Sequence, residues 1–173
     1  MKRLAALFLL LPMANLLAQS PSDSPPKRSW VNRMLHPFSS GARLPDYNDP
    51  KLRGLTLRLE LVPQPVKLSE VRLLDVKVIL TNASKRPIEL QFPNEQRIEI
   101  ALLSSTEKVL TRWSDNRAFA EKPGSVLINP GEHIEYNERI GTRDLAPNTV
   151  FIAEASFPRY PDLRVRQKFM TAP

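Results

Sequence analysis

The sequence predicts an all-β fold, an immunoglobulin-like antiparallel β-sandwich of about seven to nine strands. From Leu55 onward, short runs alternate apolar and polar residues, which is the period-2 pattern of half-buried strands. Turn residues separate the runs, and 17 prolines against 5 glycines suit a loop-rich β protein whose turns are fixed by proline. No helical pattern of comparable length competes in this region.

The first two predicted strands each show one apolar face. One begins at Leu55 and is ended by two prolines, and its inward residues are Leu55, Leu57, Leu59 and Leu61. The next has the inward set Leu74, Val76, Val78 and Leu80. Asn82 follows on the same side, where we expect its amide to bond nearby backbone and start the turn to Pro87.

The middle of the chain gives the clearest alternation. Three more inward sets are Ile88, Leu90 and Phe92, then Ile98, Ile100 and Leu102, then Val109, Thr111 and Trp113. Trp113 is predicted to be a core residue. Polar turn segments at residues 82–87, 93–96 and 104–108 make these runs neighbouring antiparallel strands.

The remaining runs follow the same rule. Their inward sets are Val126 and Ile128, then Ile134, Tyr136 and Ile140, then Phe151, Ala153, Ala155 and Phe157, then Leu163, Val165 and Phe169. We place the sandwich at residues 54–158 and treat residues 159–173 as a basic C-terminal strand or tail.

Several short motifs occur in a recognisable order along these runs. They are TNAS at the end of one strand, QFP closing the next, RIEIAL in a third, RWS followed by AF, and later NPGE. This order resembles the BsuPI family of bacterial intracellular proteinase inhibitors. The resemblance covers roughly residues 55–157. It implies the same sandwich fold and a non-catalytic protein-binding module, with a protease as the partner it suggests.

The N-terminus has the plan of a secretory signal peptide. Lys2 and Arg3 precede an apolar stretch that closes on the small residue Ala18. The stretch contains Pro12 and Asn15 and is shorter than the about 20 residues of a spanning helix. We therefore expect residues 1–18 to be removed and the protein to be periplasmic or secreted, unlike the intracellular family that it resembles.

The formal net charge of +7 is concentrated at the two ends of the chain. Residues 19–53 and residues 159–173 each carry a net charge of +3, whereas residues 54–158 carry −1. A near-neutral domain with basic flanks argues against nucleic-acid binding. The flanks are compatible with weak, salt-sensitive contact with an anionic membrane or envelope surface.

Residues 19–53 read as a Pro- and Ser-rich basic linker with one short amphipathic segment. At helical spacing, its apolar residues form a candidate surface anchor: Trp30, Met34, Leu35 and Phe38. Two interpretations stay open. The segment docks on a membrane or partner, or it folds back on its own domain and covers a sheet edge.

The residues offer little for catalysis. The chain has no cysteine and two histidines, and it lacks the common nucleophile, phosphate-binding and zinc motifs. His133 and Glu135 lie on one strand face, but no third metal ligand is apparent. We therefore predict no catalytic residue, no metal site and no cofactor.

The candidate partner-binding loop follows Trp113 and consists of Ser114, Asp115, Asn116, Arg117 and Phe119. It combines hydrogen-bonding side chains, a guanidinium and an aromatic ring. A purely structural role, in which a buried tryptophan is followed by a turn, competes with partner contact. The connector at residues 121–125 is a second candidate.

Two classes of function follow. The first is an extracytoplasmic protein-binding module of the BsuPI proteinase-inhibitor type, with protease inhibition as its sharper form. The alternative is a structural or tethering protein of the cell envelope that uses its basic flanks. The activity of a binding module resides in the sandwich domain at residues 54–158, whereas a tethering protein depends on the basic flanks.

Overall fold

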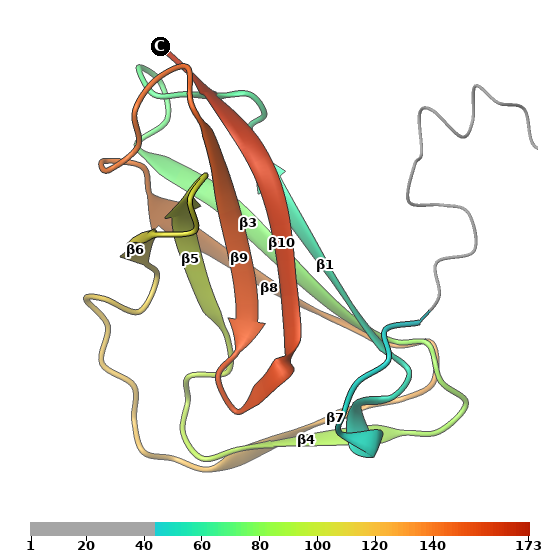
Figure 1. Cartoon of the computed structure of the whole chain (residues 1–173). Helices are drawn as coiled ribbons and strands as arrows, with labels where there is room; N and C mark the ends of the chain where they lie inside the picture. The colour runs from blue at the N-terminus through green and yellow to red at the C-terminus, as the bar shows by residue number, and fades with distance from the viewer. Residues whose placement is uncertain (1–43) are drawn as a thin grey trace, which may run out of the picture. The chain divides into compact units, whose positions relative to one another are not determined.

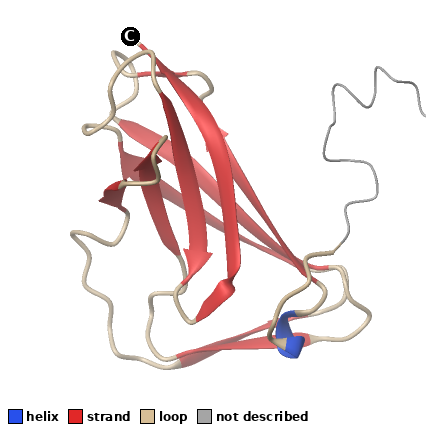
Figure 2. Ribbon diagram, viewed as in Figure 1, coloured by secondary structure: helices blue, strands red, loops and turns tan. Residues whose placement is uncertain are grey.

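The computed structural model describes residues 44–173. This part of the chain contains strands and one short 3₁₀ turn, η1 (Pro50–Leu52), and no α-helix (Figures 1 and 2). The strands are β1 (Leu55–Val62), β2 (Val66–Lys67), β3 (Leu73–Asn82), β4 (Ile88–Phe92), β5 (Glu99–Ser104), β6 (Val109–Arg112), β7 (Gly124–Ile128), β8 (His133–Gly141), β9 (Val150–Phe157) and β10 (Tyr160–Ala172). No helix among the described residues is long and apolar enough to span a membrane.

The strands form two facing sheets and a smaller ribbon. One sheet has three strands in the order β1-β3-β8, and the other has five in the order β2-β10-β9-β5-β6. β4 and β7 pair only with each other, and this β4–β7 ribbon crosses the lower end of the molecule in Figure 1. The predicted all-β sandwich is confirmed. The structure has one strand more than expected, because the two-residue β2 pairs in parallel with the end of β10.

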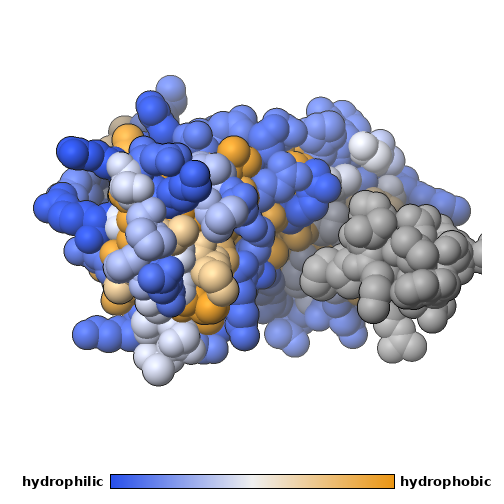
Figure 3. Space-filling model, turned by 90° about the horizontal axis from the view of Figure 1, so that it is seen from above, coloured by the Kyte–Doolittle hydropathy of each residue, from blue (hydrophilic) through white to orange (hydrophobic). Residues whose placement is uncertain are grey.

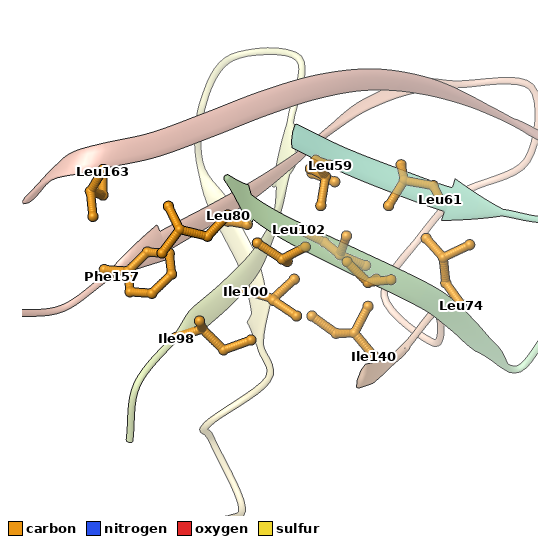
Figure 4. Packing of buried hydrophobic residues seen from close by; sticks show 14 of the residues in the cluster. Leu59, Leu61, Leu74, Leu80, Ile98, Ile100, Leu102, Ile140, Phe157 and Leu163 are labelled. Carbon is orange, nitrogen blue, oxygen red and sulfur yellow. The ribbon is translucent and has the colours of Figure 1, made fainter. Parts of the chain in front are cut away.

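The core lies between the two larger sheets, where the alternating residues of both meet (Figure 4). In β3, the four predicted inward residues are each at most 1% exposed. Ile100, Leu102 and Phe157 face them from the five-stranded sheet and are fully buried. Each such side chain contributes roughly 1.5–3 kcal/mol on burial, so this double layer supplies most of the stability of the fold.

The sandwich extends beyond the residues that the sequence assigned to it. Tyr47 and Leu52, within the predicted linker, are 7% and 1% exposed and belong to the core. β10 pairs with β9 along most of its length and contributes buried Leu163 and Phe169. The segment set apart as a basic strand or tail is thus a strand of the five-stranded sheet, and its basic residues lie on the face away from the core.

The predicted inward face of β6 is wrong at one position. A register shift between Leu102 and Leu103 inserts an extra residue opposite them, so Val109 turns outward and is 38% exposed. Leu110 packs against the core in its place. A bulge of this kind moves side chains to the other face, and the period-2 pattern alone does not show it. Trp113 is half-buried against the core rather than enclosed by it.

Asn82 has the predicted turn-forming role and is fully buried. Its amide nitrogen donates to the carbonyl oxygens of Arg86 and Ile128, each at 2.8 Å. Its amide oxygen accepts from the backbone nitrogen of Ser84 at 2.9 Å and from the Ser84 hydroxyl at 2.6 Å. One side chain therefore joins the end of β3, the following turn and the end of β7.

Candidate functional site

The segment after β6 closes one side of the sandwich. The backbone nitrogen of Trp113 donates to the Ile100 carbonyl at 2.8 Å, which attaches the segment to the five-stranded sheet. The Trp113 indole nitrogen donates to Glu138 Oε2 at 2.8 Å, on β8 of the three-stranded sheet. Trp113 thus bridges the exposed edges of the two sheets. We call residues 113–119 the edge loop.

Arg117 lies against this bridge. Its guanidinium carbon is 4.1 Å from the centre of the Trp113 ring, a cation–π contact. Its Nη2 is 3.5 Å from Glu138 Oε2, the same oxygen that accepts from the indole. The Arg117 side chain is still 44% exposed, so it is held in place without being removed from solvent.

Glu99 and Arg112 fix the first half of the edge loop. The Ser114 backbone nitrogen donates to Glu99 Oε1 at 3.3 Å, and the Ser114 hydroxyl donates to the other carboxylate oxygen. Asp115 Oδ2 accepts from the Arg112 backbone nitrogen at 2.8 Å, and the Arg117 nitrogen donates to the Ser114 carbonyl at 3.0 Å. These are turn bonds that hold a short loop in one conformation.

The five predicted partner-binding residues lie together in the edge loop, with different exposures. Asp115, Asn116 and Arg117 are exposed, whereas Ser114 and Phe119 are half-buried. The Phe119 ring lies 5.5 Å from the Trp113 ring. The loop therefore presents a polar tip on an aromatic base, and Arg117 and Glu138 also line a shallow surface hollow of about 470 Å³ beside it.

The second candidate loop continues from the first. The Ala120 carbonyl accepts from the Glu95 nitrogen at 3.1 Å, and Glu121, Lys122 and Pro123 are exposed before β7 begins at Gly124. Because Pro123 disfavours the helical region for the residue before it, Lys122 is biased toward extended backbone. The two predicted loops form one continuous segment between β6 and β7, with most of its residues exposed.

Sequence reasoning missed the anchors of this surface. Glu99 and Glu138 each accept two hydrogen bonds or charged contacts from the edge loop. Both are half-buried residues of strands, and Glu99 alternates with the inward Ile98 and Ile100, where a glutamate normally reads as solvent-facing. The only signal for Glu138 is its position on the apolar face of β8, in line with Tyr136 and Ile140.

Tyr136 lies behind this surface, two residues before Glu138 on the same face. Its hydroxyl oxygen is buried and has no hydrogen-bond partner among residues 44–173. Burial raises the pKa of Tyr136, and Arg97 opposes the shift through its charge and the closeness of its N–H groups, which do not meet hydrogen-bond geometry with the hydroxyl. The pKa of Tyr47 is also raised, first by burial and then by the carboxylate of Asp162. Both phenols are held neutral as structural groups.

A surface hollow of about 840 Å³ lies beside the β4–β7 ribbon. Gln91, Gly124 and Tyr160 line it together with charged residues such as Lys51 and Arg159. The Tyr160 hydroxyl accepts from the Gln91 nitrogen at 2.7 Å and donates to the Gln91 carbonyl at 2.9 Å. The hollow is open to solvent, and charged and polar side chains line much of it.

Of the two residues considered as partial metal ligands, Glu135 forms a salt bridge with Lys77 and lies close to His133. His133 Nε2 is 3.9 Å from Glu135 Oε1, and Lys77 Nζ is 3.1 Å from Glu135 Oε2. Within the described range, no group of three potential ligands could hold a metal ion. The candidate surface anchor, Trp30, Met34, Leu35 and Phe38, lies outside the described residues.

Exposed apolar side chains also occur where β9 begins and β10 ends. Val150 and Met170 are cross-strand partners on β9 and β10 and are 38% and 58% exposed. Figure 3 looks on this end from above and shows apolar atoms set among hydrophilic ones. The apolar area visible in this view is broken up by polar side chains.

Comparison with known proteins gives weak structural likenesses. The β-glucosidase of Listeria innocua in complex with isofagomine superposes with a TM-score of 0.42 at 12% identity, over 69% of this chain and 16% of that one. The glucosidase EmGH1 of Erythrobacter marinus gives 0.40 at 14% identity over 68% and 15%. β-Glucosidase 3B of Thermotoga neapolitana gives 0.35 at 16% identity over 67% and 16%. This chain spans about a sixth of their length, and at such TM-scores the likenesses carry no argument.

The family comparison is more informative. No curated protein matches the sequence. The profile of the BsuPI family, described as intracellular proteinase inhibitor, matches residues 66–159. That range runs from β2 to the end of β9 and includes the whole edge loop with its anchors on β5 and β8. It covers more than half of the chain and agrees with the motifs seen in the sequence. The chain belongs to the BsuPI family of proteinase inhibitors.

Proposed function

We propose that this protein is a non-catalytic protein-binding module that inhibits a protease outside the cytoplasm. The observation that carries the proposal is the family match over residues 66–159, which contains the edge loop. A rigid loop on a β-sandwich loses little conformational entropy when it binds, and this favours tight contact with a protein. The partner class comes from the description of the family, and the contact surface comes from the geometry.

The edge loop is the proposed contact surface. Asp115 and Asn116 form its exposed tip, and the hydrogen bonds to Glu99 and from Arg112 keep that tip in one conformation. Arg117 lies flat on Trp113, so it must leave the indole before it can enter a specificity pocket. Leaving costs about 0.5–1 kcal/mol at a partly exposed site. We therefore expect Asp115 and Asn116 to matter more for binding than Arg117.

The location is proposed from the N-terminal sequence. Residues 1–18 have the charged, apolar and small-residue order of a signal peptide. Export would bring this protein to proteases other than the intracellular ones for which its family is named. Intact mass of the protein from its own cells should show a chain that begins at Gln19. A full-length cytoplasmic species would contradict export.

Inhibition can be assigned to the edge loop by matched variants. The mature chain should inhibit at least one bacterial serine protease, and Asp115→Ala with Asn116→Ala should weaken inhibition by at least about tenfold. Lys85→Ala, an exposed change in the turn before β4, is the control and should have no effect. If the loop variant inhibits as well as the original chain does, the edge loop is not the contact surface.

Tethering to an anionic surface is the second candidate. The observation that favours it is the row Arg164, Arg166 and Lys168 on the outer face of β10. Two of these cations are paired: Arg166 Nε lies 2.5 Å from Glu154 Oε2, and Arg164 Nε lies 3.9 Å from Glu154 Oε1. Sedimentation with anionic vesicles at low and high salt tests this function. Salt-sensitive binding that Lys168→Ala and Arg159→Ala weaken would support it.

A further inference from the structure

Among residues 44–173, no strand pairs with the outer edge of β7. β7 pairs with β4 on one side only, as part of the two-stranded ribbon. Its sequence, GSVLI, contains no charge and no proline, although Pro123 and Pro130 flank it. Natural proteins usually protect exposed edges with charges, prolines or bulges, because unpaired backbone groups recruit another strand.

The register shows which backbone groups face outward. Gln91 directs both its nitrogen and its carbonyl to the Tyr160 hydroxyl, so neither group points toward β7. Ser125 lies opposite Gln91 and must likewise point its backbone groups away from β4. Leu127, two positions further along and opposite Glu89, has the same orientation. Among residues 44–173, no further partner bonds the backbone nitrogens of Ser125 and Leu127.

The other edge of the ribbon is occupied. On the β4 side, Tyr160 bonds both backbone groups of Gln91, and Arg86 Nη2 bonds the carbonyl of Pro50 in η1 at 3.0 Å. β4 also carries the charged Glu89 among its outward residues. Only one of the two edges of the ribbon is therefore open to another strand.

We propose that β7 pairs with β7 of a second copy of this chain, in antiparallel register about a twofold axis at Val126. In this register Ser125 lies opposite the second copy's Leu127, and their outward backbone groups form four hydrogen bonds. Small residues meet large ones, because Gly124 lies opposite Ile128 and Ser125 opposite Leu127. The Leu127 side chain, which is 56% exposed in the single chain, would lie beside Ser125 of the second copy.

The absence of charge favours a copy of the same strand over a foreign partner. Antiparallel pairing of identical charged strands often places like charges in opposition, and β7 carries no charge to oppose. A two-stranded ribbon is also marginal by itself, and pairing would make a four-stranded sheet. The edge loop is not part of the pairing surface, so the dimer does not depend on protease inhibition.

Cysteine crosslinking tests the register, because the chain has no cysteine. Val126→Cys should give a disulfide-linked dimer, since twofold-related positions in a non-hydrogen-bonded pair lie about 4.5 Å apart at Cα. Leu127→Cys alone should not crosslink, because its counterpart is two positions out of register. A mixture of Ser125→Cys and Leu127→Cys chains should crosslink to each other. Crosslinking by Leu127→Cys but not by Val126→Cys would overturn the register.

A matched pair of proline variants tests the edge itself. Leu127→Pro removes an outward nitrogen without breaking the ladder with β4, and should raise the dimer dissociation constant at least about tenfold. Glu89→Pro makes the same change on the occupied side of the ribbon, directly opposite, and should leave dimerisation unchanged. Circular dichroism confirms that both variants fold. A mature chain that stays monomeric up to millimolar concentration in sedimentation equilibrium would overturn the proposal.

Discussion

Asn82 is the residue on which most connections converge. Its side chain uses both donors and its oxygen, and it joins the end of β3 to the turn before β4 and to the end of β7. Because the site is fully buried, removal of the amide leaves several polar groups without partners. Asn82 therefore holds the β4–β7 ribbon against the three-stranded sheet.

Asn82→Ala should lower the free energy of unfolding by about 3 kcal/mol or more, at the upper end of single substitutions. Asn116→Ala, the same change at the exposed tip of the edge loop, should stay within about 0.5 kcal/mol. Urea denaturation of both variants measures the difference. Equal small losses would show that the Asn82 network contributes little.

Two tyrosine hydroxyls have opposite surroundings. The hydroxyl of Tyr136 is buried without a partner in the described structure, whereas that of Tyr160 bonds both backbone groups of Gln91. Tyr136→Phe should leave the free energy of unfolding unchanged or raise it by up to about 1 kcal/mol, and Tyr160→Phe should lower it by about 1–2 kcal/mol. Thermal melts compare the two at neutral pH.

Tyr136→Phe should also change how the free energy of unfolding depends on alkaline pH. Since the pKa of Tyr136 is raised by burial, the unfolded chain loses this proton near pH 10 while the folded chain keeps it. The free energy of unfolding should fall as the pH rises from about 10 through the folded pKa, and fall less steeply in Tyr136→Phe. Parallel slopes in the two proteins would show that Tyr136 does not titrate differently on folding.

At the scale of elements, the edge loop behaves as one coupled unit. Trp113 binds both sheets, and Arg117 lies on its ring. Trp113→Ala should cost about 2–3 kcal/mol, less than a fully buried tryptophan, and Arg117→Ala about 0.5–1 kcal/mol. In the Trp113→Ala background, Arg117→Ala should cost almost nothing. Strictly additive losses in a double-mutant cycle would contradict the stacking.

Period-2 alternation predicted most of the strands because it follows directly from burial of one face. The inward sets of β1, β3, β4 and β9 appear in the structure as the sequence indicates. The β6 bulge and the burial of Tyr47 escaped prediction, since a one-residue register shift and a lone aromatic in a proline-rich stretch leave no periodic signal.

The edge loop was found as a loop, but its internal order was not. The position of Arg117 on Trp113 depends on Glu138, which is distant in sequence and lies on the other sheet. A pairing of this kind is a tertiary contact that no local pattern encodes. The sequence could therefore nominate Ser114, Asp115, Asn116, Arg117 and Phe119 as a surface without showing which of them reach outward.

At the scale of the whole molecule, a family fold described as intracellular is joined to a leader that predicts export. The match to the family covers residues 66–159 and leaves the N-terminal 65 residues outside it. We therefore propose that the family domain carries the binding surface, and that the N-terminal sequence directs the protein to a different compartment and hence to a different protease. Crosslinking followed by affinity capture of the chain from its own cells would test whether a protease is bound.

Tight-binding titration with the mature chain tests most directly whether this protein inhibits a protease. Bacterial serine proteases, secreted and intracellular, would each be titrated at the active site and then mixed with increasing amounts of the chain. For at least one secreted protease, the activity should fall linearly to near zero at about one molar equivalent, with the chain recovered intact by mass spectrometry. Undiminished activity of every protease at micromolar chain, or steady cleavage of the chain as a substrate, would contradict protease inhibition.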